Sequence, residues 1–167
     1  MRAAQKLWWD QAKFDHDLFL ALKRGGAAEC HLLHYLQMAT EKLSKAYLWR
    51  SGHAPPKSHT GFVRLLRALM SRPKAQEQIA HIFGFKNSMD LYNGVRKMTP
   101  LAYSLQNIAP AQAGNGPNPE YPWPHDAPAH SPIAHKFILW DQLHNTWQGR
   151  DLLRFIGRAI TSFDKYA

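Results

Sequence analysis

The sequence predicts an all-α fold, a single-domain bundle of four to five helices over residues 1–167 with a proline-rich crossing before the last helix. Apolar residues recur at three- and four-residue spacing through most of the chain, which is the period of a helix with one buried face. No set of alternating apolar and polar residues indicates strands. Apolar residues make up 45% of 167, enough to form one hydrophobic core.

The first half of the chain reads as two long helices and a stiff turn. Residues 4–24 have a mostly apolar face, and this helix should end at Gly25-Gly26, since glycine is the usual residue past a helix C-terminus. Residues 27–51 form the second helix, which Gly52 closes. Pro55-Pro56 cannot continue a helix, so a turn is expected there.

Three further helical segments are expected before the crossing. One starts near Ser58, a candidate N-cap, and ends before Pro73. A shorter helix follows over 74–83. Residues 88–108 carry the next apolar stripe, which Pro100 kinks or divides.

Residues 110–134 differ in kind from the helices around them. Seven of the eleven prolines lie between Pro110 and Pro132, which predicts an extended segment. The embedded Tyr121-Pro-Trp-Pro indicates an ordered crossing packed on the helices, because these rings bury large areas. The start of the final helix is open: Phe137-Ile-Leu-Trp is either strand-like or an early turn, and Gly149 offers a break.

Charge and cysteine content limit the partners and the compartment. The formal net charge of +9 favours polyphosphates, nucleic acid or acidic proteins as contacts. The single cysteine, Cys30, allows no intrachain disulfide and is expected to be a buried small hydrophobe. The first residues lack the apolar segment of a secretory signal, and no run approaches the roughly 18 apolar residues of a membrane span. We therefore expect a soluble cytoplasmic protein.

A block of one-signed charge runs from Lys42 to Lys74, with eight Lys/Arg and no Asp/Glu. One-turn spacing puts each cation pair on one side of its helix, and the turn between the helices adds two more. The candidate binding residues are Lys42, Lys45, Arg50, Lys57, Arg64 and Arg67, with His59 at the mouth of the groove. Two interpretations are open. The block is either a solvated face, although such faces usually mix signs, or a groove for phosphates, which guanidinium groups bind well.

The chemistry of catalysis and metal binding finds little support. The chain has no phosphate-binding glycine loop, no nucleophile elbow and no pair of carboxylates at catalytic spacing. His31 and His34 lie three apart on a helix but lack a visible third ligand, so we predict no metal site and no cofactor. Glu41 stands one turn before Lys45, which favours an ordinary ion pair on an exposed helix face.

The run Ala39-Thr-Glu41-Lys42-Leu-Ser-Lys45-Ala46, with Gly52, His59 and Leu65-Leu66 after it, resembles the HEPN family (higher eukaryotes and prokaryotes nucleotide-binding domain). The similarity is best over residues 28–70. The resemblance implies a compact bundle of four or five helices, often a homodimer, in proteins tied to nucleotide binding, RNA cleavage or toxin-antitoxin and defence systems.

The chain departs from the catalytic members of this family at two places. Their ribonucleases carry an Arg followed by four to six residues and a His near the final core helix, whereas here Arg24 and His31 have that spacing between the first two helices. Another branch has an Arg-Tyr-Pro motif before the last helix, and Glu120-Tyr121-Pro122 stands in that setting here. Both differences argue against hydrolysis.

The leading hypothesis is a non-catalytic, dimeric HEPN-like protein that binds a nucleotide or RNA along the basic block. One alternative is a divergent metal-independent ribonuclease that uses Arg24, His31 or His59. The other is an interaction protein whose basic face meets an acidic partner, such as a nucleotidyltransferase-type neighbour.

Overall fold

The structure is a computed structural model that describes residues 3–49, 60–71 and 76–166. It is all-helical: the described residues form no strand, and one isolated bridge joins Trp123 to His130. The elements are α1 (Ala3–Arg24), α2 (Glu29–Leu48), α3 (Gly61–Met70), α4 (Gln76–Phe83), α5 (Ser88–Asn107), α6 (Pro110–Ala113), the 3-10 turn η3 (Pro132–Ala134), α7 (Ile138–Asn145), α8 (Trp147–Thr161) and α9 (Phe163–Tyr166).

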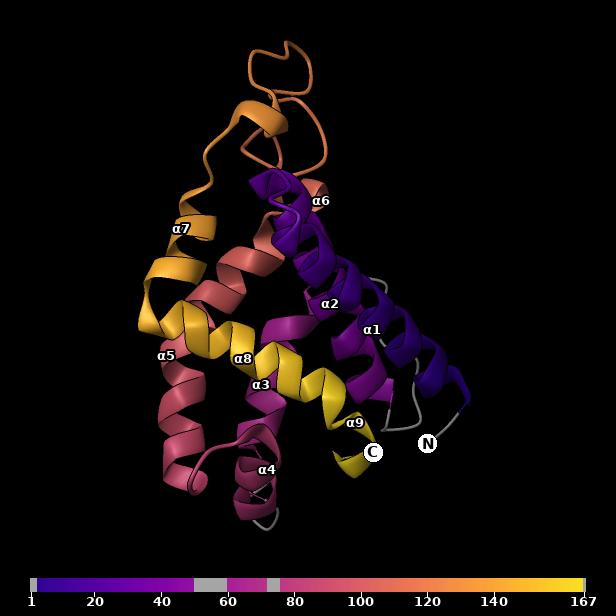
Figure 1. Ribbon diagram of the computed structural model, residues 1–167, viewed down its shortest axis with the longest axis vertical. Helices are drawn as coiled ribbons and strands as arrows, with labels where there is room; N and C mark the ends of the chain where they lie inside the picture. The colour runs from indigo at the N-terminus through magenta and orange to yellow at the C-terminus, as the bar shows by residue number, and fades with distance from the viewer. Residues whose placement is uncertain (1–2, 50–59, 72–75, 167) are drawn as a thin grey trace.

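These elements enclose one cluster of buried apolar side chains. All the helices except the short α6 contribute to it, as do Trp123 and Phe137 from the crossing. In Figure 1, α1 and α2 lie side by side, α8 runs across the bundle, and the crossing extends beyond the helices at the top of the view. The described residues contain more helices than the expected four to five because the short α6 and α9 were not expected and the final helix is divided into α7 and α8.

The first two helices end and begin as their sequences predict. Gly26 has φ +70°, the left-handed conformation that glycine adopts without strain, and it reverses the chain after α1. Ala27 N–H donates to the Leu22 carbonyl, which satisfies an acceptor in the last turn. The expected turn from Gly52 to Ser58 and the break at Pro73 lie outside the described residues.

Helix α8 is capped at its start by its own N-cap residue and at its end by side chains of α1 and α2. At its start, Thr146 Oγ1 accepts a hydrogen bond from Gly149 N–H at 3.0 Å. At its end, Trp9 Nε1 donates to the Ile160 carbonyl and Tyr47 Oη donates to the Ala159 carbonyl, both at 2.9 Å. These carbonyls have no partner within the helix, so α1 and α2 satisfy them and fix the crossing of α8 over the core.

The sequence left open where the final helical region starts and where it breaks, and the structure decides both. Of the two alternatives for Phe137-Ile-Leu-Trp, the strand is wrong and the earlier helical turn is right, since α7 begins at Ile138. The break between α7 and α8 falls at Thr146, whose backbone is extended, and not at Gly149, which lies in the first turn of α8. Pro100 lies within α5 and does not divide it.

The proline-rich crossing is anchored through Trp123, as predicted, whereas Tyr121, which the same prediction expected to be packed, is 58% exposed. Trp123 is buried against His135 and Phe137, and the Trp123–Pro124 peptide is cis. At the far end of the crossing, Glu29 accepts hydrogen bonds from Phe137 N–H at 2.8 Å and Lys136 Nζ at 3.2 Å. The first residue of α2 therefore ties the crossing to the bundle.

Two further expectations concern single features. Cys30 is buried, as expected of a small hydrophobe. Among the helices of the described residues, none combines the length and the apolar character required to cross a lipid bilayer.

Gly149 and Gly157 provide a matched pair of alanine substitutions in α8. A Cβ at Gly149 would overlap the Gln142 carbonyl oxygen and lie 2.5 Å from Leu143 Cα, both backbone atoms, whereas at Gly157 the nearest atom is 3.9 Å away. We expect Gly149→Ala to lower the free energy of unfolding by about 1–3 kcal/mol or more. Gly157→Ala should raise it by up to about 1 kcal/mol through helix propensity. Urea unfolding measures both, and equal effects would contradict the close α7–α8 contact.

Burial makes the stability of the fold depend on pH through two histidines. The pKa of His16 is lowered chiefly by burial, with Lys13 adding and Asp17 opposing, and burial also lowers the pKa of His144. Below about pH 6.5 the unfolded chain therefore binds more protons at these histidines than the folded chain does. The free energy of unfolding should keep their full contribution above that pH and decrease below it. His16→Gln should lose less unfolding free energy than wild type between about pH 7.5 and 5.5. Equal losses in urea titrations would contradict this assignment.

Candidate functional site

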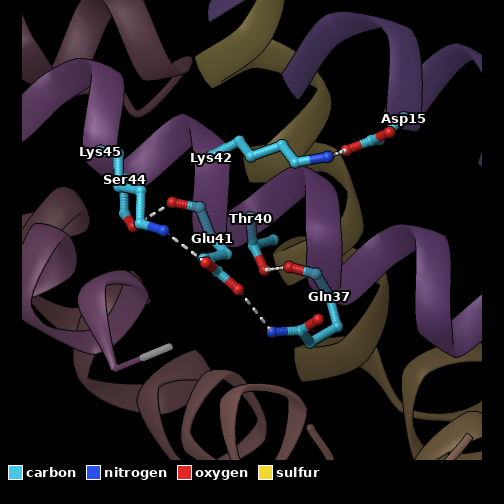
Figure 2. A network of polar contacts seen from close by, with 7 residues as sticks. All are labelled: Asp15, Gln37, Thr40, Glu41, Lys42, Ser44 and Lys45. Atoms are coloured by element: carbon cyan, nitrogen blue, oxygen red, sulfur yellow. Dashed lines mark hydrogen bonds and ion pairs between the residues drawn. The ribbon is translucent and has the colours of Figure 1, made fainter. Parts of the chain in front are cut away.

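The first two cations of the basic block lie at the contact between α1 and α2 (Figure 2). Lys42 Nζ donates to Asp15 Oδ2 at 2.5 Å, across the two helices. Lys45 Nζ donates to Glu41 Oε1 at 2.6 Å, and Gln37 Nε2 reaches the other carboxylate oxygen at 3.3 Å. Both carboxylates are buried, and both lysine side chains are only 15% exposed. The Glu41–Lys45 pair predicted from spacing is confirmed, but on a buried face and not on an exposed one.

Lys45 has a further partner in α1. Its ammonium group lies 4.8 Å from the centre of the Trp8 ring, within the range of a cation–π contact. The block from Lys42 to Lys74 contains no carboxylate in sequence, yet Glu41, the residue before it, and Asp15, in α1, neutralise its first two lysines in space. Cationic groups other than Lys42 and Lys45 are therefore the ones that remain to attract an anion.

The other predicted binding residues are divided between α3 and segments of the chain outside the described residues. Arg64 and Arg67 are exposed on α3, and neither has an ion-pair partner within the described residues. Arg50, Lys57 and His59 lie outside the described residues. Of the residues predicted to line the groove, the described part of the chain therefore contains two lysines that are already paired with carboxylates and two exposed arginines.

Of the three weak catalytic candidates, His59 lies outside the described residues, and the other two are at helix ends. Arg24 is the last residue of α1 and His31 lies in the first turn of α2, and both side chains are exposed. His34 is half-buried, with Nδ1 3.4 Å from Glu120 Oε1. The described residues contain no group of three His, Cys, Asp or Glu side chains arranged to hold a metal ion.

A pocket of about 300 Å³ lies between α4, α5 and α8, where the sequence analysis placed no site. The start of α5 and one face of α8 line two sides, and the turn after α4 closes the third. Its lining residues are Phe83, Gly84, Phe85, Lys86, Asp90, Asn93, Gly94, Lys97, Trp147, Asp151, Arg154, Phe155 and Arg158. We call this the α4–α5–α8 pocket.

Two glycines allow side chains to pack closely at its wall. Gly84 has φ +78°, and the Arg158 guanidinium occupies the space where a Cβ on Gly84 would stand. Gly94 is covered by the Phe85 ring, which would overlap a Cβ built at that position. Larger residues at either position would displace Arg158 or Phe85 and change the wall of the pocket.

Positive charge exceeds negative charge around the pocket. The Lys97 ammonium lies 4.9 Å from the centre of the Trp147 ring, which is 46% exposed. Arg154 Nη1 pairs with Asp151 Oδ1 at 3.1 Å. With Asp90 as the second carboxylate, four Lys/Arg side chains face two acidic ones, so the pocket carries a net positive charge that suits an anionic ligand.

One hydrogen-bonded carboxylate ties the walls of the pocket together. Glu77 in α4 accepts from Ser88 N–H at 3.2 and 3.3 Å, at the first residue of α5. These hydrogen bonds from Ser88 favour the charged form and lower the pKa of the Glu77 carboxyl group. The start of α5 is thereby held beside α4, which keeps Asp90, Gly94 and Lys97 at the pocket.

Residue spacing alone contains a signal for this pocket. Trp147, Asp151, Arg154 and Arg158 follow each other at intervals of four, three and four residues, which places them on one face of α8. The sequence analysis considered only the apolar face of this helix. That polar face stays exposed, and it lines a pocket with α5 only because α8 crosses the bundle.

Comparisons with models of known protein families, with curated proteins and with solved structures found no match to this chain.

The Asp15–Lys42 ion pair has an exposed counterpart in α1, which provides a control. Removing one partner of a buried ion pair leaves the other charge unmatched, so Asp15→Asn or Lys42→Met should lower the free energy of unfolding by about 3–5 kcal/mol. The Lys13–Asp17 pair has side chains more than half exposed, and Lys13→Met or Asp17→Asn should change it by less than about 1 kcal/mol.

A double-mutant cycle in urea tests the pairing itself. The Asp15→Asn/Lys42→Met double variant should be less destabilised than the sum of the single variants, by a coupling of about 0.5–3 kcal/mol. Additive effects would mean that the two side chains do not interact in solution.

Proposed function

We propose that this protein binds a nucleotide or the nucleotides of an RNA, without cleaving them, and that the α4–α5–α8 pocket is its binding site. The observation that carries the proposal is the combination, around one pocket, of four Lys/Arg side chains and an exposed tryptophan ring. Phosphate groups and bases need these two kinds of side chain in the same place.

The cations support the phosphate part of the proposal. Arg154 and Arg158 are exposed on one face of α8, and guanidinium groups bind phosphate oxygens through two parallel hydrogen bonds. Lys86 and Lys97 approach from the other walls. Only Arg154 has an ion-pair partner among the described residues, and Asp151 in that pair is itself about one-third exposed.

The aromatic side chains support the base part. Trp147 presents nearly half of its surface to solvent at the edge of the pocket, so its ring is accessible to a ligand. Base–aromatic stacking contributes about 1–3 kcal/mol per base in nucleic-acid-binding proteins. A purely inorganic anion would make no use of this ring.

The HEPN resemblance adds an expectation of the same ligand class, although the residues of its motif make structural contacts here. Lys42 and Lys45 contact Asp15 and Trp8 of α1, and Glu41 pairs with Lys45 within α2. We therefore assign the ligand to the α4–α5–α8 pocket and keep Arg64 and Arg67 as secondary phosphate contacts. No observation on the described residues favours the ribonuclease or the acidic-partner alternative.

A substitution within α8 tests the site. Arg158→Ala should weaken binding of a fluorescein-labelled single-stranded RNA of about eight nucleotides by about tenfold, because it removes a charged hydrogen bond to phosphate. The slope of log affinity against log salt concentration should become shallower by about 0.7 for each phosphate that the variant no longer neutralises. Fluorescence anisotropy at several salt concentrations measures both quantities.

Arg150→Ala is the matched control, since Arg150 is exposed on the same helix, outside the pocket lining. It removes the same charge and should leave affinity and salt slope close to wild type. Equal effects of the two substitutions would indicate diffuse attraction and exclude the pocket as the site. Gel analysis with EDTA present should show intact RNA, and cleavage would support the ribonuclease alternative instead.

A further inference from the structure

A second, smaller pocket of about 230 Å³ adjoins the α4–α5–α8 pocket. It is lined by Lys97, Pro100, Leu101, Gln142, Thr146 and Gln148. Lys97 lines both pockets, and the first residues of α8 alternate between them: Trp147 lines the first, while Thr146 and Gln148 line the second. The two pockets are therefore neighbouring compartments separated by Lys97 and the first turn of α8.

From this arrangement we infer that the ligand is a single-stranded chain of at least two nucleotides, with its linking phosphate at Lys97 and its second unit in the smaller compartment. This inference rests on the function proposed above and names the substrate class of the same site. A single nucleotide would leave the second compartment empty.

The sizes of the compartments support a ligand of two units. Pockets for small molecules usually have about 300–1,000 Å³, so the first compartment is at the lower end of that range and the second is below it. Neither one alone accommodates a large ligand. Together they form a track in which repeating units of similar size follow one another.

The first compartment is cationic and suits a phosphate, whereas the second has neutral polar groups that suit a base. The first contains three cations besides Lys97, whereas the second contains none. Its polar groups are neutral: the Thr146 hydroxyl already bonds Gln142 O and Gly149 N–H, while the half-buried Gln142 and Gln148 side-chain amides have no hydrogen bond within the described residues. Each amide offers both donors and an acceptor, which suits a base edge, and Pro100 and Leu101 add an apolar wall.

Lys97 has the position that a linking phosphate requires. Its ammonium group lies over the Trp147 ring, at the boundary of the two compartments, and its side chain is exposed. A base on Trp147 and a base against Gln148 would be joined by a backbone that passes this ammonium group. Lysine suits that role because its flexible stem lets a single charge follow a phosphate.

The test compares ligands of different length. AMP and the 5′-phosphorylated dinucleotide pApA compete against the labelled RNA, and the dinucleotide should bind about 5- to 150-fold more tightly, the factor that one additional stacked base supplies. Gln148→Trp should fill the second compartment and remove this advantage, with AMP binding retained. Gln148→Leu, which adds little bulk, should reduce the advantage and serves if the tryptophan variant does not fold. Gln11→Trp, at an exposed position on α1, is the control and should leave both affinities unchanged.

The outcomes separate this inference from the proposed function. Equal affinities of AMP and pApA, with binding still lowered by Arg158→Ala, would overturn the two-unit ligand and leave the nucleotide site intact. An advantage of pApA that survives both Gln148 substitutions would also overturn it, because the second base would then bind elsewhere. If neither ligand binds and Arg158→Ala changes nothing, the proposed function itself fails.

Discussion

The burial of two carboxylates, Asp15 in α1 and Glu41 in α2, is the constraint on which the first half of the fold depends. Asp15 and Glu41 are almost fully removed from water, and a buried carboxylate is tolerated only when a cation and hydrogen bonds compensate for the lost hydration. Lys42 and Lys45 provide that compensation: the Asp15–Lys42 pair joins the two helices, while the Glu41–Lys45 pair lies within α2 and places the Lys45 ammonium group over the Trp8 ring of α1. The same contacts neutralise the charge that made these lysines attractive as ligand-binding residues. A cationic run in a sequence thus turns out to be partly internal.

The position of α8 links this helical pair to the candidate site. Trp9 of α1 and Tyr47 of α2 satisfy the last carbonyls of α8, while Gly149 lets its first turn pack directly on the backbone of α7. With both ends held, α8 crosses the bundle (Figure 1) and directs its polar face toward α5. That crossing brings Trp147 and Arg158 to Lys97, far from them in sequence. The geometry of the pocket is therefore a consequence of contacts made on the opposite side of the same helix.

The proposed site differs from the predicted one in how its charge is arranged. Along α2, each lysine is opposed by a carboxylate at hydrogen-bond distance, and the charge is matched within the fold. Around the α4–α5–α8 pocket, cations outnumber carboxylates and stay exposed beside an aromatic ring. Unmatched charge next to an accessible ring is an arrangement that folding does not require, and this is why it supports a binding role. The neutral compartment beyond Lys97 extends that role to a longer ligand.

Local patterns in the sequence determined most of the helices, the glycine reversal after α1, the burial of Cys30 and Trp123, and the Glu41–Lys45 pair. Each of these follows from residues a few positions apart or from the apolar character of one side chain. Only the tertiary structure decided that Lys42 meets Asp15, 27 residues away, that the final helix breaks at Thr146, and that α4, α5 and α8 share a pocket. The physical reason is that helical periodicity specifies which residues share one face of a helix. It does not specify which other helix packs against that face. Tertiary packing decides this. Here it pairs some charges inside the fold, where they stabilise it, and leaves others exposed at the proposed ligand site.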